Sequence, residues 1–378
     1  MFSISAGATP AAVSTKGTAT PPRTRYAVVG AGWRASVFLR MAYLMPDRFE
    51  VTGVVTRRAE AGAELEAQWG VATFRDVETL LATDRPDFVV LSVPWPVTPE
   101  LTRQLVAAGV PVLAETPPAP DAGGLRALWH DVGASGLVQV AEQYALMPLN
   151  AARLAVVDSG LIGTASSALV SSTHLYHAVA LMRRLLGVGR EGATVRAQTF
   201  AAELVDPITP AGWTHDTSAK PATTTLAWVD FGGDRMGRYD FTDNQWWNPL
   251  RPDHLVVRGS AGEIWDETVV RMADEVTPMT SRLERAGTGT GMNYEGLDLT
   301  HVSLDGRVVW RNAFEGARLS DDDLAVAQLL AQTGAWVRGE GEPPYPLAEA
   351  CHDHLVGLAI GEAAESGGSV RVEPDVWS

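Results

Sequence analysis

The feature that most constrains this chain is a glycine-rich turn, Gly30-Ala31-Gly32-Trp33-Arg34-Ala35, set between a predicted strand and a predicted helix. The first two glycines permit a tight turn and a close backbone approach to a diphosphate, and the small Ala35 lets the helix pack on a sheet. The N-terminus of the helix adds unpaired N–H groups and a positive dipole end that attract phosphate. The alternative is a plain glycine turn, but the strand–turn–helix context favours a dinucleotide site.

The segments around this turn alternate between short apolar runs and helical stretches. Strands are predicted at 26–29, 51–56, 88–93, 111–114 and 137–144, with helices between them. The run 88–93 is continuously apolar, as is typical of a strand buried on both faces. This alternation predicts an α/β Rossmann domain over residues 23–145, with a doubly wound parallel sheet.

The pattern changes after residue 145. Helices are predicted at 149–158 and 176–186, and a further pair at 322–338 and 347–364. Between them, alternating runs predict strands of a large, mainly antiparallel open sheet; these runs are 194–201, 223–231, 236–242, 254–258, 301–304 and 307–311. We therefore expect a C-terminal α+β domain over residues 146–378 for substrate binding and oligomerisation, with a mobile glycine-rich loop near 283–293.

Charge and composition exclude several classes of partner. The chain has 45 acidic and 30 basic side chains, a net charge of −15, which disfavours nucleic acid and anionic lipid. Residues 1–22 are small and polar and predict a disordered tail without the pattern of a secretory signal. The single cysteine, Cys351, rules out an internal disulfide and fits a reducing compartment. We expect a cytoplasmic protein that does not enter a membrane.

The end of the second predicted strand indicates the type of dinucleotide. NAD-binding domains usually place an acidic residue there, whereas this chain has Thr56-Arg57-Arg58. A hydroxyl and two guanidinium groups would attract a ribose 2′-phosphate that a carboxylate would repel. NADP(H) is therefore favoured over NAD(H), unless the two arginines are only solvated surface charges.

Several stretches together resemble the Gfo/Idh/MocA oxidoreductases. These stretches are FVVLSVPWPVT (88–98), LTRQLVAAGVPVLAETPPA (101–119), YHAVALMRRLLG (176–187) and LAEACHDHLVGLAIGEAAESGGSVRV (347–372). The resemblance covers nearly everything from residue 25 onward. It implies dehydrogenase activity, a homodimer or homotetramer formed through the open sheet, and cofactor contacts from Ser92, Val93, Pro94, Trp95, Glu115 and Thr116.

The chain departs from the family at two catalytic positions. The family's Glu-Lys-Pro turn reads Glu115-Thr116-Pro117, and the Asp four residues before the family's His is Thr173. The His itself is retained as His177. Biliverdin reductase and thiazolinyl imine reductases resemble this fold and also lack that Lys. The galactose-pathway repressor shares the fold without being an enzyme.

Hydride transfer requires a group that gives or takes a proton, and His177 is the first candidate. Tyr144, after the last Rossmann strand, is a second candidate, and Thr116 can supply a hydroxyl. Their alternatives are a helix-capping histidine and a tyrosine that packs between domains. Thr173, His174, Trp246 and Trp247 are candidate substrate contacts, although both tryptophans would also suit a core or a subunit interface.

The run Cys351-His352-Asp353-His354 has the composition of a metal site but not its spacing. On a helix, His352 and His354 point to different faces, and no second ligand group is evident. We therefore predict that the chain has no metal site.

The favoured hypothesis is an NADP-dependent oxidoreductase acting on a sugar, cyclitol or related small polar substrate. Three alternatives stay open: a reductase of an imine or conjugated system, a cofactor-binding sensor without turnover, and NAD-assisted glycoside cleavage. Tightly held oxidised cofactor would favour glycoside cleavage, rapid exchange with NADPH would favour either reductase, and sugar-induced cofactor binding without redox change would favour the sensor.

Overall fold

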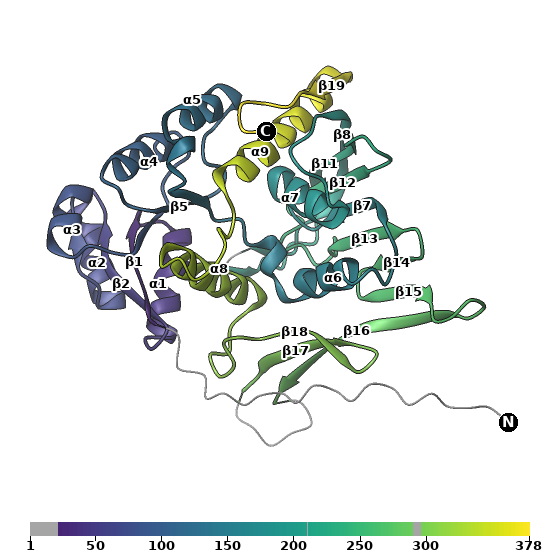
Figure 1. The fold of residues 1–378 in the computed structure, drawn as a ribbon, viewed down its shortest axis with the longest axis horizontal. Helices are drawn as coiled ribbons and strands as arrows, with labels where there is room; N and C mark the ends of the chain where they lie inside the picture. Colours follow the sequence, from purple (N-terminus) through teal and green to yellow (C-terminus); the bar gives the residue numbers. More distant parts are fainter. Residues whose placement is uncertain (1–21, 210, 290–295) are drawn as a thin grey trace.

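Two β-sheets, one from each part of the chain, organise the computed structural model (Figure 1). The structure describes residues 22–209, 211–289 and 296–378, so almost all of the tail expected at 1–22 lies outside the described residues. In Figure 1 the first sheet lies in the purple and blue part of the ribbon and the second in the teal and green part, apart from its yellow edge strand near the C-terminus, with helices between the two sheets.

The first sheet is six-stranded and parallel throughout, with strand order β3-β2-β1-β4-β5-β6. This is the doubly wound order in which ligands bind where the winding direction reverses, between β1 and β4. The strands are β1 Thr24–Val29, β2 Phe49–Val55, β3 Thr73–Phe74, β4 Phe88–Leu91, β5 Val112–Ala114 and β6 Val138–Val140. The helices are α1 Trp33–Leu44, α2 Ala59–Trp69, α3 Val77–Thr83, α4 Thr98–Ala107 and α5 Ala122–Val132, with the 3₁₀ turn η1 Gly133–Ser135.

The second sheet has eleven strands in the order β18-β17-β16-β15-β14-β13-β7-β12-β11-β8-β19. Its neighbours are antiparallel except for β7 and β12, which run parallel. Its strands are β7 Ala165–Ser171, β8 Ala193–Val205, β11 Ala219–Asp230, β12 Met236–Thr242, β13 His254–Gly259, β14 Gly262–Trp265, β15 Thr268–Met272, β16 Pro278–Thr288, β17 Asp298–Leu304, β18 Arg307–Arg311 and β19 Ser369–Val372; β9 Ile208–Thr209 and β10 Gly212–Trp213 form a separate pair. The remaining elements are η2 Tyr144–Leu146, α6 Pro148–Asp158, α7 Leu175–Leu186, α8 Asp321–Val337 and α9 Leu347–Ser366.

Alternating burial explains why this sheet covers a core on one face only. Every second residue of β12 is buried, as expected for a strand whose side chains point alternately to two faces. The buried face of the sheet packs against the apolar side chains of α7. The predicted α/β fold, with a parallel Rossmann sheet and a larger antiparallel sheet, is confirmed.

Two C-terminal helices cross back to the first sheet. Leu324 and Leu330 of α8 pack in the same core cluster as Phe38 of α1. The first turn of α9 packs against the opposite face of that sheet through Leu347, whereas Ile360 at its other end lies in the core of the second sheet. The boundary predicted at 145/146 therefore separates the two sheets but not the cores around them, because α8 packs in the core of the first sheet and α9 contributes to the cores of both sheets (Figure 1).

One segment differs from its sequence prediction. The stretch near 283–293 was expected to be a glycine-rich loop, but its first six residues belong to β16. Cross-strand pairing with β17 supplies the hydrogen bonds, and a register shift between Ala286 and Gly287 accommodates the glycine. Gly289 follows the end of this strand, and residues 290–295 lie outside the described residues.

Across residues 22–209, 211–289 and 296–378, no helix combines the length and apolar character needed to cross a bilayer. In the same residues, no group of three or more His, Cys, Asp and Glu side chains is placed to hold a metal ion.

Replacing His352 with leucine is expected to reduce the loss of stability in acid. His352 is fully buried, and neither ring nitrogen has a hydrogen-bond partner among the described residues. Burial lowers the pKa of its imidazole from 6.5 to about 4. The unfolded chain therefore binds a proton in this pH range that the native chain does not, so stability is retained above pH 6.5 and falls as the pH drops towards 4, by up to about 3 kcal/mol.

Urea unfolding of the wild-type protein and the His352→Leu variant from neutral to acid pH measures this difference. His130→Leu is the matched control, because the His130 side chain is 88% exposed. This variant removes a histidine but leaves the buried His352 in place, so its stability should depend on pH as that of the wild type does. Equal pH slopes for the wild type and His352→Leu would contradict the prediction.

Candidate active site

A deep cleft of about 1730 Å³ lies between the two domains. It is larger than the roughly 300–1,000 Å³ of a typical small-molecule pocket, so it has room for a dinucleotide and a substrate together. One end is formed by the turn between β1 and α1, and the other by the loop before α7 and the segment between β12 and β13. The cleft therefore opens at the carboxyl ends of the parallel strands, as expected for this strand order.

Gly30 fixes the start of the cleft because no other residue fits its position. Its φ angle is +129°, and a Cβ added there would lie 2.0 Å from the backbone oxygen of Ser92. Its N–H donates to the backbone oxygen of Val55 at 3.0 Å. The turn is thus held against the ends of both neighbouring strands, β2 and β4.

Gly32 has a different reason to be glycine. It is the N-cap of α1, in an extended conformation that any residue adopts, and a Cβ there would meet no protein atom within 4 Å. The first N–H of the helix with an intrahelical partner is that of Ser36, which donates to Gly32 O at 3.3 Å. The preceding N–H groups point out of the helix end, so the space beside Gly32 suits a diphosphate.

The end of β2 adds positive charge to the cleft. Thr56 is buried, whereas Arg57 and Arg58 are exposed, line the cleft and form no ion pair with any described residue. Arg75, from the β3–α3 segment, also lines the cleft and donates to Thr56 O at 2.9 Å. Two guanidinium groups without carboxylate partners fit the 2′-phosphate that the sequence predicts at this place.

The remaining predicted cofactor residues also line the cleft. Ser92, Val93, Pro94 and Trp95 follow β4. Trp33 opens α1 with 81% of its surface exposed, and Trp95 is 47% exposed. Exposed tryptophans inside a cleft are positioned for contact with a flat ligand rather than for core packing.

Arg34 of α1 connects its helix to the end of β5 and to α8 through ion pairs in the cleft wall. Its guanidinium forms ion pairs with Glu115 after β5, at 2.7 Å, and with Asp322 of α8, at 3.2 Å. Gln143 also donates to Asp322, at 3.1 Å. Although burial opposes it, the charges of Glu115 and Asp322 raise the pKa of Arg34 above its usual value. Arg34 was predicted as a cofactor contact, and its charge is already neutralised within the cleft wall.

His177 lies at the other end of the cleft and is held by a carboxylate that sequence reasoning missed. Its Nδ1 contacts Glu142, which follows β6, and both side chains are buried. Glu142 also accepts a hydrogen bond from the backbone N–H of Tyr144 at 3.1 Å. Because Nδ1 is engaged, the ring presents its other nitrogen, Nε2, which has no partner among the described residues.

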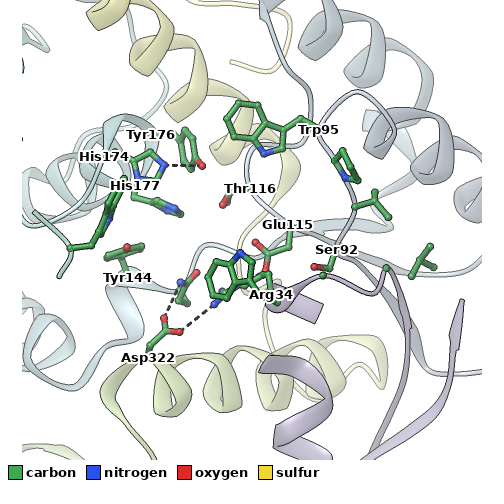
Figure 2. Close-up of a pocket in the computed structure, with 18 of the residues that line it drawn as sticks. Arg34, Ser92, Trp95, Glu115, Thr116, Tyr144, His174, Tyr176, His177 and Asp322 are labelled. Carbon is green, nitrogen blue, oxygen red and sulfur yellow. Dashed lines mark hydrogen bonds and ion pairs between the residues drawn. The ribbon is translucent and has the colours of Figure 1, made fainter. Parts of the chain in front are cut away.

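Four further predicted or neighbouring side chains converge on His177 (Figure 2). The rings of Tyr144 and Tyr176 each lie 4.4 Å from the imidazole, centroid to centroid. His174 Nε2 and Tyr176 Oη are 3.1 Å apart, and Thr116 faces the same space. Burial raises the pKa of Tyr144 and lowers the pKa of His174 to about 4. Neutral polar groups therefore surround one buried carboxylate–imidazole pair.

The predicted substrate contacts divide into two groups. Trp246 and Trp247 line the cleft and are 42% and 45% exposed, and the Trp246 ring lies 4.9 Å from that of His174. Thr173 is fully buried and does not line the cleft. It was expected one helical turn before His177, but α7 begins only at Leu175, whose φ of +34° breaks any such turn.

Arg153 of α6 adds a buried cation at the substrate end. It donates from Nε to Asp266 O at 2.8 Å and from Nη1 to Asn150 Oδ1 at 2.7 Å. Burial lowers its pKa to about 10. Its remaining nitrogen, Nη2, has no partner among the described residues and is available for an oxygen in the cleft.

Sequence reasoning missed Glu142, Tyr176, Arg153 and Asp322. Glu142 stands directly after the last predicted Rossmann strand, and this position gave a usable signal, because strand ends of this sheet meet at the ligand site. Asp322 gave no signal in the sequence, because it lies almost 300 residues after its partner Arg34 and reaches it only when α8 packs on the first sheet.

Residues 24–142 match the model of a family described as "Oxidoreductase family, NAD-binding Rossmann fold" (GFO_IDH_MocA). This range covers the first sheet, including the Gly30 turn, the arginines after β2 and Glu142. No curated protein sequence matches the chain.

Solved structures share the fold over nearly the whole chain. Levoglucosan dehydrogenase, in complex with NADH and levoglucosan, is 15% identical with a TM-score of 0.68, covering 93% of this chain and 99% of that one. A myo-inositol dehydrogenase from Corynebacterium glutamicum is 17% identical with a TM-score of 0.63, covering 93% and 100%. The WlbA dehydrogenase from Bordetella pertussis, in complex with NADH and UDP-GlcNAcA, is 17% identical with a TM-score of 0.64, covering 95% and 100%.

Alanine is expected to affect a different property at each glycine of the turn: protein stability at Gly30 and NADPH affinity at Gly32. Gly30→Ala places a Cβ against Ser92 O and forces a positive φ on alanine, so it should lower stability by about 1–2 kcal/mol or more. Gly32→Ala meets no protein atom, so the melting temperature should hold while the Kd for NADPH rises about tenfold or more through lost backbone–phosphate hydrogen bonds. Thermal melts and calorimetric titration measure both quantities; unchanged NADPH binding by Gly32→Ala would show that the diphosphate lies elsewhere.

Proposed function

Because the dinucleotide-binding domain of this chain belongs to the Gfo/Idh/MocA oxidoreductase family, we propose that the chain transfers hydride between NADP(H) and a sugar, cyclitol or related small polar substrate. The observation that carries this proposal is the buried Glu142–His177 pair in the same cleft as the Gly30 turn. The cofactor, when bound, accepts or supplies the hydride at its nicotinamide ring. A group that handles the accompanying proton therefore lies where the reaction needs it.

His177 is the proton acceptor in the oxidising direction. Its contact with Glu142 keeps the Nδ1 hydrogen in place, so the Nε2 lone pair is available to a substrate hydroxyl. As the hydroxyl O–H bond breaks, its proton moves to Nε2, and the buried carboxylate of Glu142 stabilises the resulting imidazolium. In the reducing direction the same nitrogen returns the proton to the substrate oxygen.

The wall of the substrate end supports a small polar ligand. Arg153 Nη2 offers a hydrogen bond, since Asn150 engages the Nη1 atom of the same guanidinium, and the exposed indoles of Trp246 and Trp247 offer flat apolar surfaces for sugar C–H groups. Levoglucosan and UDP-GlcNAcA, both carbohydrate-based, are the ligands found with two proteins of the same fold.

The preference for NADP(H) rests on the two unpaired arginines after β2. NADH is the cofactor in those two complexes, so the proposed preference is argued from the residues of this chain and not from these neighbours. The outer face of the open sheet supports assembly into a homodimer or homotetramer, because Phe200 of β8 and Trp228 of β11 lie exposed on one face of it.

Buried Cys351, the chain's single cysteine, is compatible with a cytoplasmic location.

Removing both arginines is expected to weaken NADPH binding selectively. In the Arg57→Ala/Arg58→Ala variant, the Kd for NADPH should rise about 10²-fold and that for NADH less than about threefold, because only NADPH carries the 2′-phosphate. Arg85→Ala/Arg103→Ala is the control with the same charge change, since both arginines lie on the Rossmann domain outside the cleft. Equal weakening of the two cofactors in calorimetric titrations would refute the phosphate role.

Variants of the histidine pair are expected to lose turnover but keep cofactor binding. His177→Ala should lower kcat by about 10²–10⁴-fold, and Glu142→Gln by about 10²-fold, since a neutral amide stabilises the imidazolium less. Activity is followed by nicotinamide absorbance with a panel of polyols and sugars, and NADPH affinity by calorimetry. The control is Glu349→Gln, which breaks an ion pair with Arg183 outside the cleft and should lower only the melting temperature.

Two outcomes would contradict this assignment. Wild-type protein that binds NADPH but turns over no member of the panel would favour the sensor hypothesis. Parallel losses of kcat, NADPH affinity and melting temperature in His177→Ala would make His177 a structural residue.

A further inference from the structure

The turn before α7 is strained and is held from two sides. Leu175 has a φ of +34°, in the left-handed region that residues other than glycine rarely adopt. Its N–H donates to the hydroxyl of Tyr239 at 3.2 Å. On the other side, α9 approaches so closely that a Cβ at Gly357 would lie 3.2 Å from the backbone nitrogen of Tyr176. Strain maintained in this way is typical of functional sites.

The result of this strain is that three side chains from four consecutive residues meet at one point of the cleft. The His174 ring lies 5.0 Å from that of Tyr176 and 5.1 Å from that of His177, centroid to centroid. The Tyr176 hydroxyl faces the space beside Thr116 (Figure 2). Thr116 occupies the lysine position of the family's Glu-Lys-Pro turn, so this position brings a hydroxyl to that space in place of an ammonium group.

The hydrogen bond between His174 and Tyr176 has a preferred direction. Burial lowers the pKa of His174 to about 4, so its imidazole is neutral near pH 7 and carries one N–H. The Nδ1 atom is enclosed and has no partner among the described residues, while Nε2 lies 3.1 Å from Tyr176 Oη. An enclosed N–H without a partner is more costly than an enclosed acceptor without one. The hydrogen therefore belongs on Nε2, which donates to Tyr176.

This direction leaves the phenolic hydrogen of Tyr176 available. Because Tyr176 Oη accepts from His174 Nε2, its own O–H is oriented away from the histidine. Burial raises the pKa of Tyr176 by more than a hydrogen bond with Thr116 lowers it, so the phenol keeps its hydrogen. A hydrogen bond that lowers a phenol pKa is one that Thr116 donates to the phenol oxygen, so it does not engage the hydrogen of Tyr176 itself. Tyr176 is therefore a hydrogen-bond donor, and His177 remains the group that takes or returns a proton.

We propose that Tyr176, positioned by His174, is a further catalytic residue that donates a hydrogen bond to the reacting oxygen of the substrate, in place of the ammonium that Thr116 cannot supply. This inference rests on the proposed function. In the oxidising direction the substrate hydroxyl loses its proton to His177 Nε2, and the Tyr176 O–H stabilises the negative charge that develops on the oxygen. No proton leaves Tyr176, so the balance of the reaction is unchanged.

The kinetic test compares Tyr176→Phe, His174→Gln and the double variant, using the polyol or sugar that the wild type oxidises fastest in the panel. Tyr176→Phe should lower kcat by about 10–10²-fold, with KM and NADPH affinity within about twofold, because the bond strengthens only as charge develops. His174→Gln should have no further effect in the Tyr176→Phe background, since it acts through the phenol. Tyr26→Phe removes a comparably buried hydroxyl, bonded to Phe38 O at 2.7 Å, and should change stability without changing kcat.

The spectroscopic test needs no substrate. In ¹⁵N-edited NMR spectra, the imidazole signals lost in His174→Gln belong to His174, and they should show a neutral ring with its hydrogen on Nε2. An Nδ1–H ring would overturn the proposal, as would wild-type kcat in Tyr176→Phe or full additivity in the double variant. If the wild type turns over no substrate, the proposed function fails, while the tautomer still decides whether His174 donates to Tyr176.

Discussion

The close approach of Gly30 to Ser92 is the constraint on which the cleft depends. A backbone with φ near +129° and no room for a Cβ brings the end of β1 against the end of β4, and α1 then begins with its unpaired N–H groups facing the opening between the domains. Arg34, in the first turn of the same helix, reaches Glu115 and Asp322 and so connects this opening to β5 and α8. The glycine-turn end and the wall of the cleft are therefore positioned by a single turn.

The chemistry at the opposite end follows from burial. Glu142 and His177 come from different domains, and each satisfies the other's polar group in a region where water is largely excluded. A buried carboxylate left alone would be unfavourable, whereas paired with an imidazole it fixes which ring nitrogen faces the cleft. Because α9 contributes to the cores of both domains, the two halves of this pair are held at a fixed distance. The same packing, through Gly357, holds the strained turn that presents His174 and Tyr176.

The sequence predicts local and sequential features of this fold well. The order of the Rossmann elements, the Gly30 turn and the arginines after β2 are read from periodicity and from a motif whose parts lie within one βαβ unit. It does not predict the return of α8 to the first sheet, the short strand β3 and helix α3, or the extension of β16 into the glycine-rich stretch. These features depend on pairing and packing between distant segments. His177 was predicted from the sequence and lines the cleft, but its partner Glu142 and the position of Thr173 depend on how the two domains meet.

A crystal structure of the protein with NADP⁺ bound is the most direct measurement of the central claim, that one cleft joins a dinucleotide site at the Gly30 turn to a proton-handling histidine. The account predicts the diphosphate beside Gly32, the 2′-phosphate between Arg57 and Arg58, and the nicotinamide ring within reach of the space bounded by His177, Tyr176 and Thr116. A nicotinamide directed away from His177, or a dinucleotide bound outside this cleft, would contradict it.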